Sequence, residues 1–160
     1  MANENNGTIK TAKDIMTKEV YLIRLDTSVT EAAKIMDENG LDGLPIVDKD
    51  KVLLGIVTQY DLIKNAAHVH LPTLQIIFKN LYIKDSKEVE EEKKKITSLA
   101  VKDVMNPDPL ILKPDVDIAE VISLFKDHHL VNPIPVIDES RRVIGIISRY
   151  DIIKLLHFNI

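Results

Sequence analysis

The sequence predicts a mixed α/β (α+β) fold made of two β-α-β-β-α repeats, packed as one pseudo-two-fold module with a linker helix inserted between them. Two observations predict it: an internal repeat, and the same order of apolar patterns in each copy. Each copy, at roughly 50–60 residues, is too small to bury much apolar surface alone. Repeated units bury their apolar faces against each other, so we expect two repeats but one folded module.

The repeat begins at Lys13–Met16, whose sequence KDIM returns 89 residues later as KDVM at Lys102–Met105. A single extra residue near Pro133 then moves the offset to 90, and in that register Tyr60–Asp61 meets Tyr150–Asp151. Chance does not hold an alignment through an insertion, so the two copies are a true internal repeat.

This alignment divides the chain into four segments. Residues 11–66 form the first repeat and residues 98–160 form the second. Residues 1–10 carry no readable pattern and are expected to be a disordered tail. Residues 67–97 are expected to be a helical linker segment.

Each copy opens with a short extended run, Val20–Arg24 in the first and Leu110–Lys113 in the second. A helix follows, and a capping residue with a glutamate three positions later marks its start. Apolar residues at i, i+3, i+4 and i+7 place one apolar stripe on each helix. The capping pairs are Ser28 with Glu31 and Asp117 with Glu120, and the stripes are Val29, Ala32, Ala33 and Met36, and Ile118, Val121, Ile122 and Phe125.

Two apolar runs joined by a polar turn follow each helix, which is the pattern of a β-hairpin. A second helix then closes each copy. In the first copy the runs are Leu44–Val47 and Leu53–Thr58, the turn is Asp48–Lys51 and the helix spans about 60–66. In the second copy the runs are Ile134–Ile137 and Val143–Ser148, the turn is Asp138–Arg142 and the helix spans about 150–158.

The linker segment contains a helical pattern of its own. A helix that starts near Pro72 has an apolar stripe formed by Leu74, Ile77, Phe78 and Leu81. We expect this helix to cover the module or its dimer interface; docking to a partner protein or a membrane surface is the alternative. The charged run 84–95 that follows is expected to be a solvated helix face.

Composition excludes several classes of protein. The 160 residues are 45% hydrophobic, carry a net charge of −4 and include no cysteine. Global disorder, disulfides and thiolate metal sites are therefore excluded, and nucleic acid is not an expected partner. No apolar run approaches the ~18 residues of a transmembrane helix, and residues 1–10 lack the apolar core of a signal peptide. We expect a cytoplasmic protein without a transmembrane segment.

The sequence offers no motif for catalysis or metal binding. The GxSxG, GxGxxG and GxxxxGK[ST] patterns of common hydrolases and nucleotide enzymes do not occur. The histidines lack the spacing of a ligand set, so we expect no metal site. They are His68, His70, His128, His129 and His157. A small enzyme using Asp61 or Asp151 as an acid or base is a weak hypothesis, because it lacks a nucleophile or a metal. We predict no enzyme and no catalytic residues.

One stretch stands out because it occurs in both copies, as GIVTQYD at Gly55–Asp61 and as GIISRYD at Gly145–Asp151. A strand ends in a hydroxyl residue, Thr58 or Ser148, and an aspartate follows three positions later in the first turn of a helix. This arrangement caps a helix well. It also suits a ligand, since a carboxylate can accept both hydroxyls of a ribose and a helix N-terminus suits a phosphate. Both interpretations stay open, but the occurrence of the motif at matched positions in both copies makes capping alone a less sufficient explanation.

Here the chain resembles a known family, because the repeated unit looks like a pair of cystathionine-β-synthase (CBS) domains, a Bateman module. The likeness rests on three pairs of stretches: DIMT and DVMN, LPIVD and IPVID, and GIVTQYD and GIISRYD. It implies a freestanding regulatory, energy-sensing module that binds AMP, ADP, ATP or S-adenosylmethionine and signals by a change of conformation or dimer geometry. It also implies a homodimer and, beyond this regulatory ligand, no cofactor.

The resemblance further implies which residues form the ligand sites. Asp61 and Asp151 are expected to contact the ribose hydroxyls, and Thr58 and Ser148 to help hold the ribose or phosphate. The adenine pockets are expected to be lined by the segments and backbone around Thr17, Val20, Leu44, Pro45, Asn106, Pro109, Ile134 and Pro135.

Phosphate-bearing ligands are expected to favour the second copy. Some nucleotide-binding members of the family place basic residues just before the proline, where this chain has Asp42 in the first copy and Asn132 in the second. Asp42 would repel a phosphate, whereas Arg149, beside Ser148, is expected to supply positive charge.

The alternative to a ligand sensor is a ligand-independent scaffold that dimerises and recruits a partner through the linker helix. Only the sensor predicts that an adenosyl ligand raises the melting temperature. In either case the effector is expected to be another protein, which the sequence does not identify.

Overall fold

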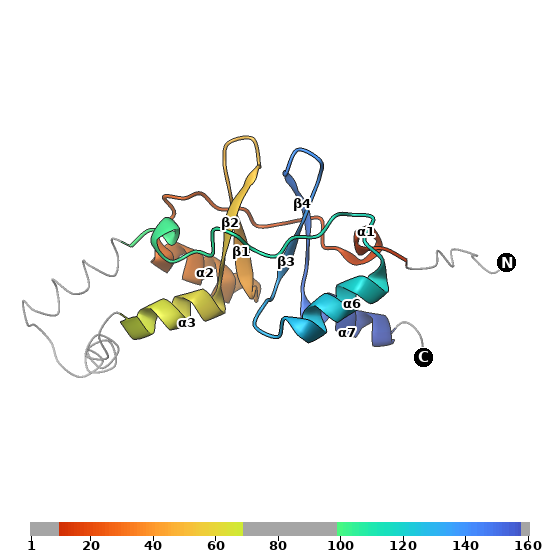
Figure 1. Cartoon of the computed structure of the whole chain (residues 1–160). Helices are drawn as coiled ribbons and strands as arrows, with labels where there is room; N and C mark the ends of the chain where they lie inside the picture. Colours follow the sequence, from red (N-terminus) through yellow and green to blue (C-terminus); the bar gives the residue numbers. More distant parts are fainter. Residues whose placement is uncertain (1–9, 69–98, 158–160) are drawn as a thin grey trace, which may run out of the picture. The chain divides into compact units, whose positions relative to one another are not determined.

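The structure is a computed structural model that describes residues 10–68 and 99–157 (Figure 1). The predictions for the N-terminal tail, for the linker helix at residues 72–81 and for the charged run 84–95 fall almost wholly outside the described residues. In chain order the described elements are α1 (Ala12–Ile15), α2 (Val29–Asn39), β1 (Gly43–Val47), β2 (Leu53–Thr58), α3 (Gln59–His68), η1 (Val101–Asp103), α6 (Ile118–Asp127), β3 (Ile134–Ile137), β4 (Val143–Ile147) and α7 (Arg149–His157).

The predicted order of helix, hairpin and helix is confirmed in both repeats. Strands β1 and β2 form one antiparallel pair, and β3 and β4 form another. The extended run that opens each repeat is shorter than predicted and makes a single parallel bridge, Ile23 to Ile46 in the first repeat and Leu112 to Val136 in the second. The pairing stops there because the chain turns directly afterwards, with Thr27 N–H donating to the Arg24 carbonyl.

The chain folds into two compact units, whose boundaries differ from those of the sequence repeats. One unit is Tyr21–Pro109, and the other combines the chain up to Val20 with Leu110 and all that follows. The segment with α1 therefore packs with the second repeat, and the segment with η1 packs with the first. For brevity, Tyr21–Pro109 is called the central unit and the other the terminal unit.

Each unit has its own apolar core. The two exchanged segments, residues 10–20 with α1 and residues 99–109 with η1, each contribute to the core of the unit that contains the other sequence repeat. In the terminal unit Ala12 of α1 is fully buried against residues of the second repeat, and in the central unit Val101 of η1 is fully buried against residues of the first. Of the stripes predicted for α2 and α6, Ala32, Met36, Val121 and Phe125 are buried, whereas Ala33 and Ile122 are exposed. Ile35 and Leu124, which the predicted stripes leave out, pack against the cores instead. The two cores are Ala12, Leu112, Val121, Phe125, Ile134, Val136 and Ile147, and Ile23, Ala32, Met36, Leu44, Ile46, Val57 and Val101.

Local chemistry sets the element boundaries. Ser28 Oγ accepts the N–H of Glu31 at 3.1 Å at the start of α2, and Asp117 Oδ1 accepts the N–H of Ala119 at 2.8 Å at the start of α6. Helix α2 ends at Gly40, whose φ of 62° is a left-handed conformation that glycine adopts without strain. In the short N-terminal turn, the N–H of Lys10 and then the N–H and hydroxyl of Thr11 donate to Asp14, which holds the pKa of its carboxyl below the ordinary value.

No helix in the described ranges has the length and apolar character needed to cross a membrane.

Candidate functional site

The first copy of the repeated motif lies where β2 passes into α3, in the central unit. Asp61 Oδ2 accepts the N–H of Thr58 at 2.9 Å and its hydroxyl at 2.7 Å, and the Thr58 hydroxyl accepts the N–H of Asp61 at 3.3 Å. Thr58 is only 9% exposed. These reciprocal bonds are a capping box, which satisfies N–H groups that the first turn of a helix leaves without partners.

The second copy lies where β4 passes into α7, in the terminal unit, and repeats the aspartate half of this geometry, while the Asp151 N–H donates to the Ser148 backbone carbonyl at 3.1 Å. Asp151 Oδ2 accepts the N–H and the hydroxyl of Ser148, both at 2.8 Å. The other carboxylate oxygen, Oδ1, lies 3.4 Å from the Thr17 hydroxyl and 3.3 Å from Lys154 Nζ. Asp151 is 7% exposed, so its charge is nearly buried and is compensated by hydrogen bonds and by the ammonium group.

The capping interpretation therefore holds in both copies. In both motifs the capping bonds go to Oδ2, and in the second motif Oδ1 lies near the Thr17 hydroxyl and the Lys154 ammonium group. The helix N-terminus adds a favourable field for an anion. Capping fixes the orientation of the carboxylate, which is a condition for binding a diol rather than an alternative to it.

The exchanged segments run alongside the motifs. Thr17 pairs with Ile146 of β4, with N–H to carbonyl distances of 2.9 and 3.0 Å, and Asn106 pairs with Ile56 of β2 at 2.9 and 3.0 Å. Thr17 of the first sequence repeat thus meets Asp151 of the second, while Asn106 of the second meets the strand that carries Thr58. Each candidate site combines residues of both sequence repeats.

The two prolines of the predicted sites lie opposite the residues that pair with the exchanged segments. Pro45 faces Ile56 and Pro135 faces Ile146 in the two hairpins. Ile56 and Ile146 direct their N–H and carbonyl groups to Asn106 and Thr17, so the β1–β2 and β3–β4 pairings lose no hydrogen bond where proline lacks an N–H. On the other side, the carbonyls of Pro45 and Pro135 accept the N–H groups of Ile23 and Leu112. This is the physical reason that a central strand accepts proline here.

The motif glycines make the close approach of the exchanged segments possible. A Cβ added to Gly55 would lie 2.7 Å from the Asn106 carbonyl oxygen and 3.0 Å from Met105 Sδ. A Cβ added to Gly145 would overlap the Met16 side chain, with Cγ only 2.8 Å away. These distances are too short for a carbon atom. At Gly55 the obstacle is backbone, so the position requires a residue without a side chain, whereas at Gly145 it is the Met16 side chain, which would have to move.

Arg149 is held by the loop before β3. Its N–H donates to Asn132 Oδ1 at 2.9 Å, and its guanidinium donates to the His129 carbonyl. The matching Gln59 behaves alike, since its side chain donates to the Leu41 carbonyl at 3.0 Å. Arg149 thus has a structural role that sequence analysis did not predict, while the remaining donors of its guanidinium stay available for a ligand.

The other residues predicted for the sites divide between the units. The central unit contains Leu44 and Pro45 in β1, both buried, and ends at Pro109. The terminal unit contains the buried Ile134 and Pro135 in β3, and its first segment ends at Val20. The structure brings Thr17, Ser148 and Asp151 together in one unit, and Thr58, Asp61 and Asn106 in the other.

Three contributors were not predicted as site residues: Lys154, and the methionines Met16 and Met105 that cover the motif glycines. The repeat itself carried the signal. Met16 aligns with Met105, and Lys154 aligns with Lys64, in the same register as the motif. Within the described ranges, no three His, Cys, Asp or Glu side chains gather closely enough to hold a metal ion.

Comparison with known proteins places this geometry in a family. The family model described as CBS domain matches residues 12–68 and 101–158. The Methanocaldococcus jannaschii protein MJ1426 is 29% identical over 160 residues, with 94% of each chain covered. Inosine-5'-monophosphate dehydrogenase of the same organism is 31% identical over 146 residues, which are 91% of this chain but 23% of that enzyme.

Solved structures agree with this match. The CBS domain pair of protein MJ0100, in complex with 5'-methylthioadenosine and S-adenosyl-L-methionine, superposes with a TM-score of 0.69 at 25% identity, covering 91% of this chain and 98% of that one. CBSX2 from Arabidopsis thaliana superposes with a TM-score of 0.68, also at 25% identity, covering 92% of this chain and 94% of that one.

Proposed function

The chain belongs to the CBS domain family and carries two CBS domains, and from this premise we propose that it is a regulatory module that binds an adenosine-containing ligand. The observation that carries the proposal is the capped aspartate that occurs once in each unit, Asp61 and Asp151. The ligand class is AMP, ADP, ATP or S-adenosylmethionine. A protein partner then responds to the conformation or dimer geometry that the ligand favours.

The chemistry of each capped motif suits a nucleoside. The cap holds the carboxylate in a fixed orientation, and a carboxylate can accept both hydroxyls of a ribose. Apolar and backbone groups of paired residues lie on the strand that leads to each motif. They belong to Pro45, Ile56 and Asn106 in the central unit and to Pro135, Ile146 and Thr17 in the terminal unit. The MJ0100 pair, which binds S-adenosyl-L-methionine, supports this ligand class.

The second motif suits a phosphate better than the first. Arg149 precedes Asp151 by two positions, and the Lys154 ammonium lies 3.3 Å from the carboxylate, whereas the first motif has Gln59 in place of Arg149. Lys154 also lies over the Tyr150 ring, 4.6 Å from its centre, which holds it near the site. We therefore expect AMP, ADP or ATP to bind more tightly at Asp151 than at Asp61.

Thermal unfolding against AMP, ADP, ATP and S-adenosylmethionine, with GTP as the control ligand, tests the proposal. We expect one adenosyl ligand to raise the melting temperature with concentration, by the equivalent of about 2.7 kcal/mol at 100 times its Kd. Asp151→Asn and Asp61→Asn should each weaken binding by about tenfold or more at their own site, because asparagine keeps an acceptor for the cap but loses the charge.

Asp37→Asn in α2 is the matched control, since Asp37 is exposed and lies outside both motifs. Binding unchanged in the Asp61→Asn, Asp151→Asn double variant would remove these residues from the site. No shift with any ligand, in folded protein free of bound nucleotide, would contradict the sensor. Equal losses of AMP affinity in the two single variants would contradict the preference for the second motif.

We also propose that the chain forms a homodimer through the second helix of each repeat. Tyr60 and Ile63 of α3 are 46% and 71% exposed, and Tyr150 and Ile153 of α7 are 64% and 55% exposed. Apolar side chains exposed at matched positions of a repeat are typical of an interaction surface. Sedimentation should show a dimer, and Ile63→Glu with Ile153→Glu should shift it to monomer, while Lys34→Glu on α2 should not. A wild-type chain that stays monomeric at all concentrations would refute this.

A further inference from the structure

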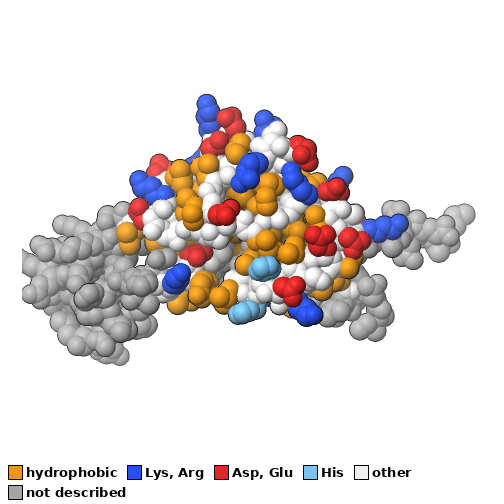
Figure 2. Space-filling view, viewed as in Figure 1, with side chains coloured by type: hydrophobic (Ala, Val, Ile, Leu, Met, Phe, Trp, Pro, Cys, Tyr) orange, Lys and Arg blue, Asp and Glu red, His pale blue; other side chains and the backbone are white. Residues whose placement is uncertain are grey.

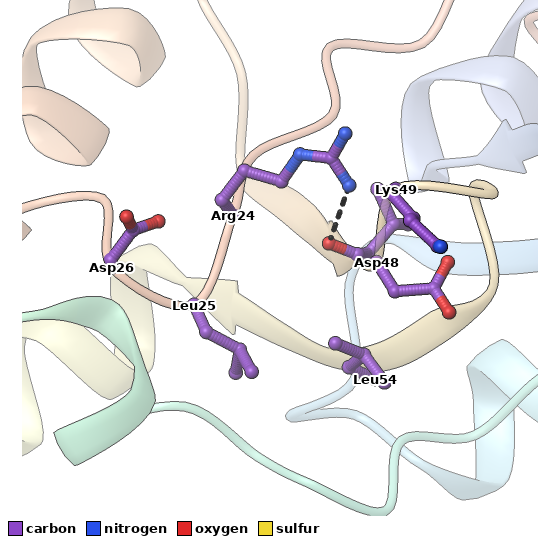
Figure 3. A pocket seen from close by; sticks show the side chains of 7 residues that line it. Arg24, Leu25, Asp26, Asp48, Lys49 and Leu54 are labelled. Carbon is purple, nitrogen blue, oxygen red and sulfur yellow. Dashed lines mark hydrogen bonds between the residues drawn. The ribbon is translucent and has the colours of Figure 1, made fainter.

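A hollow of about 420 Å³ lies at the hairpin end of the central unit, away from the Thr58–Asp61 motif. Figure 1 shows the β1–β2 turn at the opposite end of the strands from α3. Figure 3 shows the Arg24 and Lys49 side chains along one side of the hollow and the Leu25 and Leu54 side chains along the other. The remaining lining residues are Asp26, Val47 and Asp48.

The two cations of the hollow differ in how they are held. Arg24 is fixed by a 3.2 Å hydrogen bond from its guanidinium to the Val47 carbonyl. Lys49 is exposed at the hairpin turn. Among the described residues no salt bridge reaches either cation, and Asp48 directs Oδ1 to the N–H groups of Asp50 and Val52 at 2.9 Å each. Asp48 therefore serves the turn, as Asp138 does in the second repeat.

The second repeat shows what an anion does at the equivalent position. Lys113 aligns with Arg24 and also donates to the hairpin backbone, one position further along, at 3.1 Å to the Asp138 carbonyl. Glu139 aligns with Lys49, and its carboxylate lies 3.4 Å from Lys113 Nζ. The second repeat thus supplies a carboxylate from its own turn. The first repeat has the opposite charge at that position, so two cations lie beside an apolar surface, together with Asp26 and Asp48. The second repeat has aspartates at both matching positions, Asp115 and Asp138, and Lys113 still pairs with the Glu139 carboxylate there.

We propose that this hollow binds a small organic carboxylate, whose anionic group takes the position beside Arg24 that Glu139 takes beside Lys113. An arginine offers a forked pair of donors that matches a carboxylate, and Lys49 adds a second charge. The apolar part of the ligand packs on Leu25 and Leu54. The volume lies within the range of small-molecule sites, which combine apolar walls with a few placed polar groups. Figure 2 shows basic and acidic side chains together over the hairpin turns.

Titration of the ¹⁵N-labelled protein with sodium benzoate, followed by amide chemical shifts, tests the site. We expect saturable shifts centred on the residues that line the hollow, beyond those caused by sodium chloride at the same ionic strength. Lys49→Glu should weaken benzoate binding by about tenfold or more, because it removes one cation and supplies a competing carboxylate. This variant copies the residue that the second repeat already has at this position, so the turn should tolerate it.

Lys51→Glu is the matched control, because it makes the same charge change in the same turn but does not line the hollow. It should leave the affinity for benzoate within twofold of the wild type. Shifts no larger than those given by chloride, or equal binding by Lys49→Glu, would overturn the proposal. The nucleotide response depends on Asp61 and Asp151 and should persist in Lys49→Glu, so the two proposals fail independently.

Discussion

Gly55→Ala is expected to lower the free energy of unfolding by about 2 kcal/mol, since a methyl group at this position would lie 2.7 Å from the Asn106 carbonyl oxygen. The clash is with backbone that is itself hydrogen-bonded to Ile56, so it cannot be relieved by a side-chain rotation. Alanine gains a few tenths of a kcal/mol through the unfolded chain, which offsets only part of the penalty. Urea unfolding measures the loss, and faster amide exchange at Asn106 locates it.

Gly145→Ala provides the matched comparison in the terminal unit. Its neighbour is the Met16 side chain, which can rotate away, so the loss should stay near 1 kcal/mol. Met16→Ala should recover most of that loss in the double variant, because it removes the overlapping atoms. An equal loss at both glycines would show that the two exchanged segments respond in the same way, and that backbone rigidity at Asn106 does not matter.

Most of the fold could be predicted from the sequence, because local patterns determine it. The strand Leu53–Thr58 and the hairpin turns agree with the structure, and the helix caps Ser28 and Asp117 lie where their side chains accept N–H groups. Hydrophobic periodicity and turn chemistry are local properties, and each repeat satisfies them separately. The internal repeat supports each of these predictions a second time, but the short helices α1 and η1 were not predicted.

The exchange of the first segments could not be predicted in this way. KDIM and KDVM are nearly identical, so nothing local tells Thr17 to pair with β4 rather than with β2 of its own repeat. The choice depends on contacts between residues far apart along the chain, Thr17 with Ile146 and Asn106 with Ile56. For the same reason the contact between Thr17 and Asp151, and the roles of Met16 and Met105, became visible only in three dimensions.

Asp151→Ala is expected to destabilise the terminal unit by about 3 kcal/mol, which is more than Asp61→Ala costs the central unit. Asp151 is 7% exposed, and its carboxylate accepts from Ser148 twice and lies near both Thr17 and Lys154. Alanine leaves the capped N–H and the ammonium group without this partner in a nearly buried place, and a lost charge-assisted bond costs about 1.5–3 kcal/mol. Asp61 is more exposed, so water can replace its carboxylate and the loss should be about 1–2 kcal/mol.

The place where Asp151→Ala loses stability shows whether the carboxylate only caps α7 or also holds the segment around Thr17 in the terminal unit. Asp151 contacts Thr17 across 134 positions of sequence, so its removal should speed amide exchange at Thr17 as well as in the first turn of α7. Asp151→Asn should restore the cap but only part of the contact with Lys154. A double-mutant cycle with Thr17→Val should give a coupling of about 0.5 kcal/mol, small because the hydroxyl lies 3.4 Å away. If Asp151→Ala changed exchange only in α7, the carboxylate would serve the helix alone, and the exchanged segment would be held by its backbone pairing with Ile146 and by Met16 on Gly145.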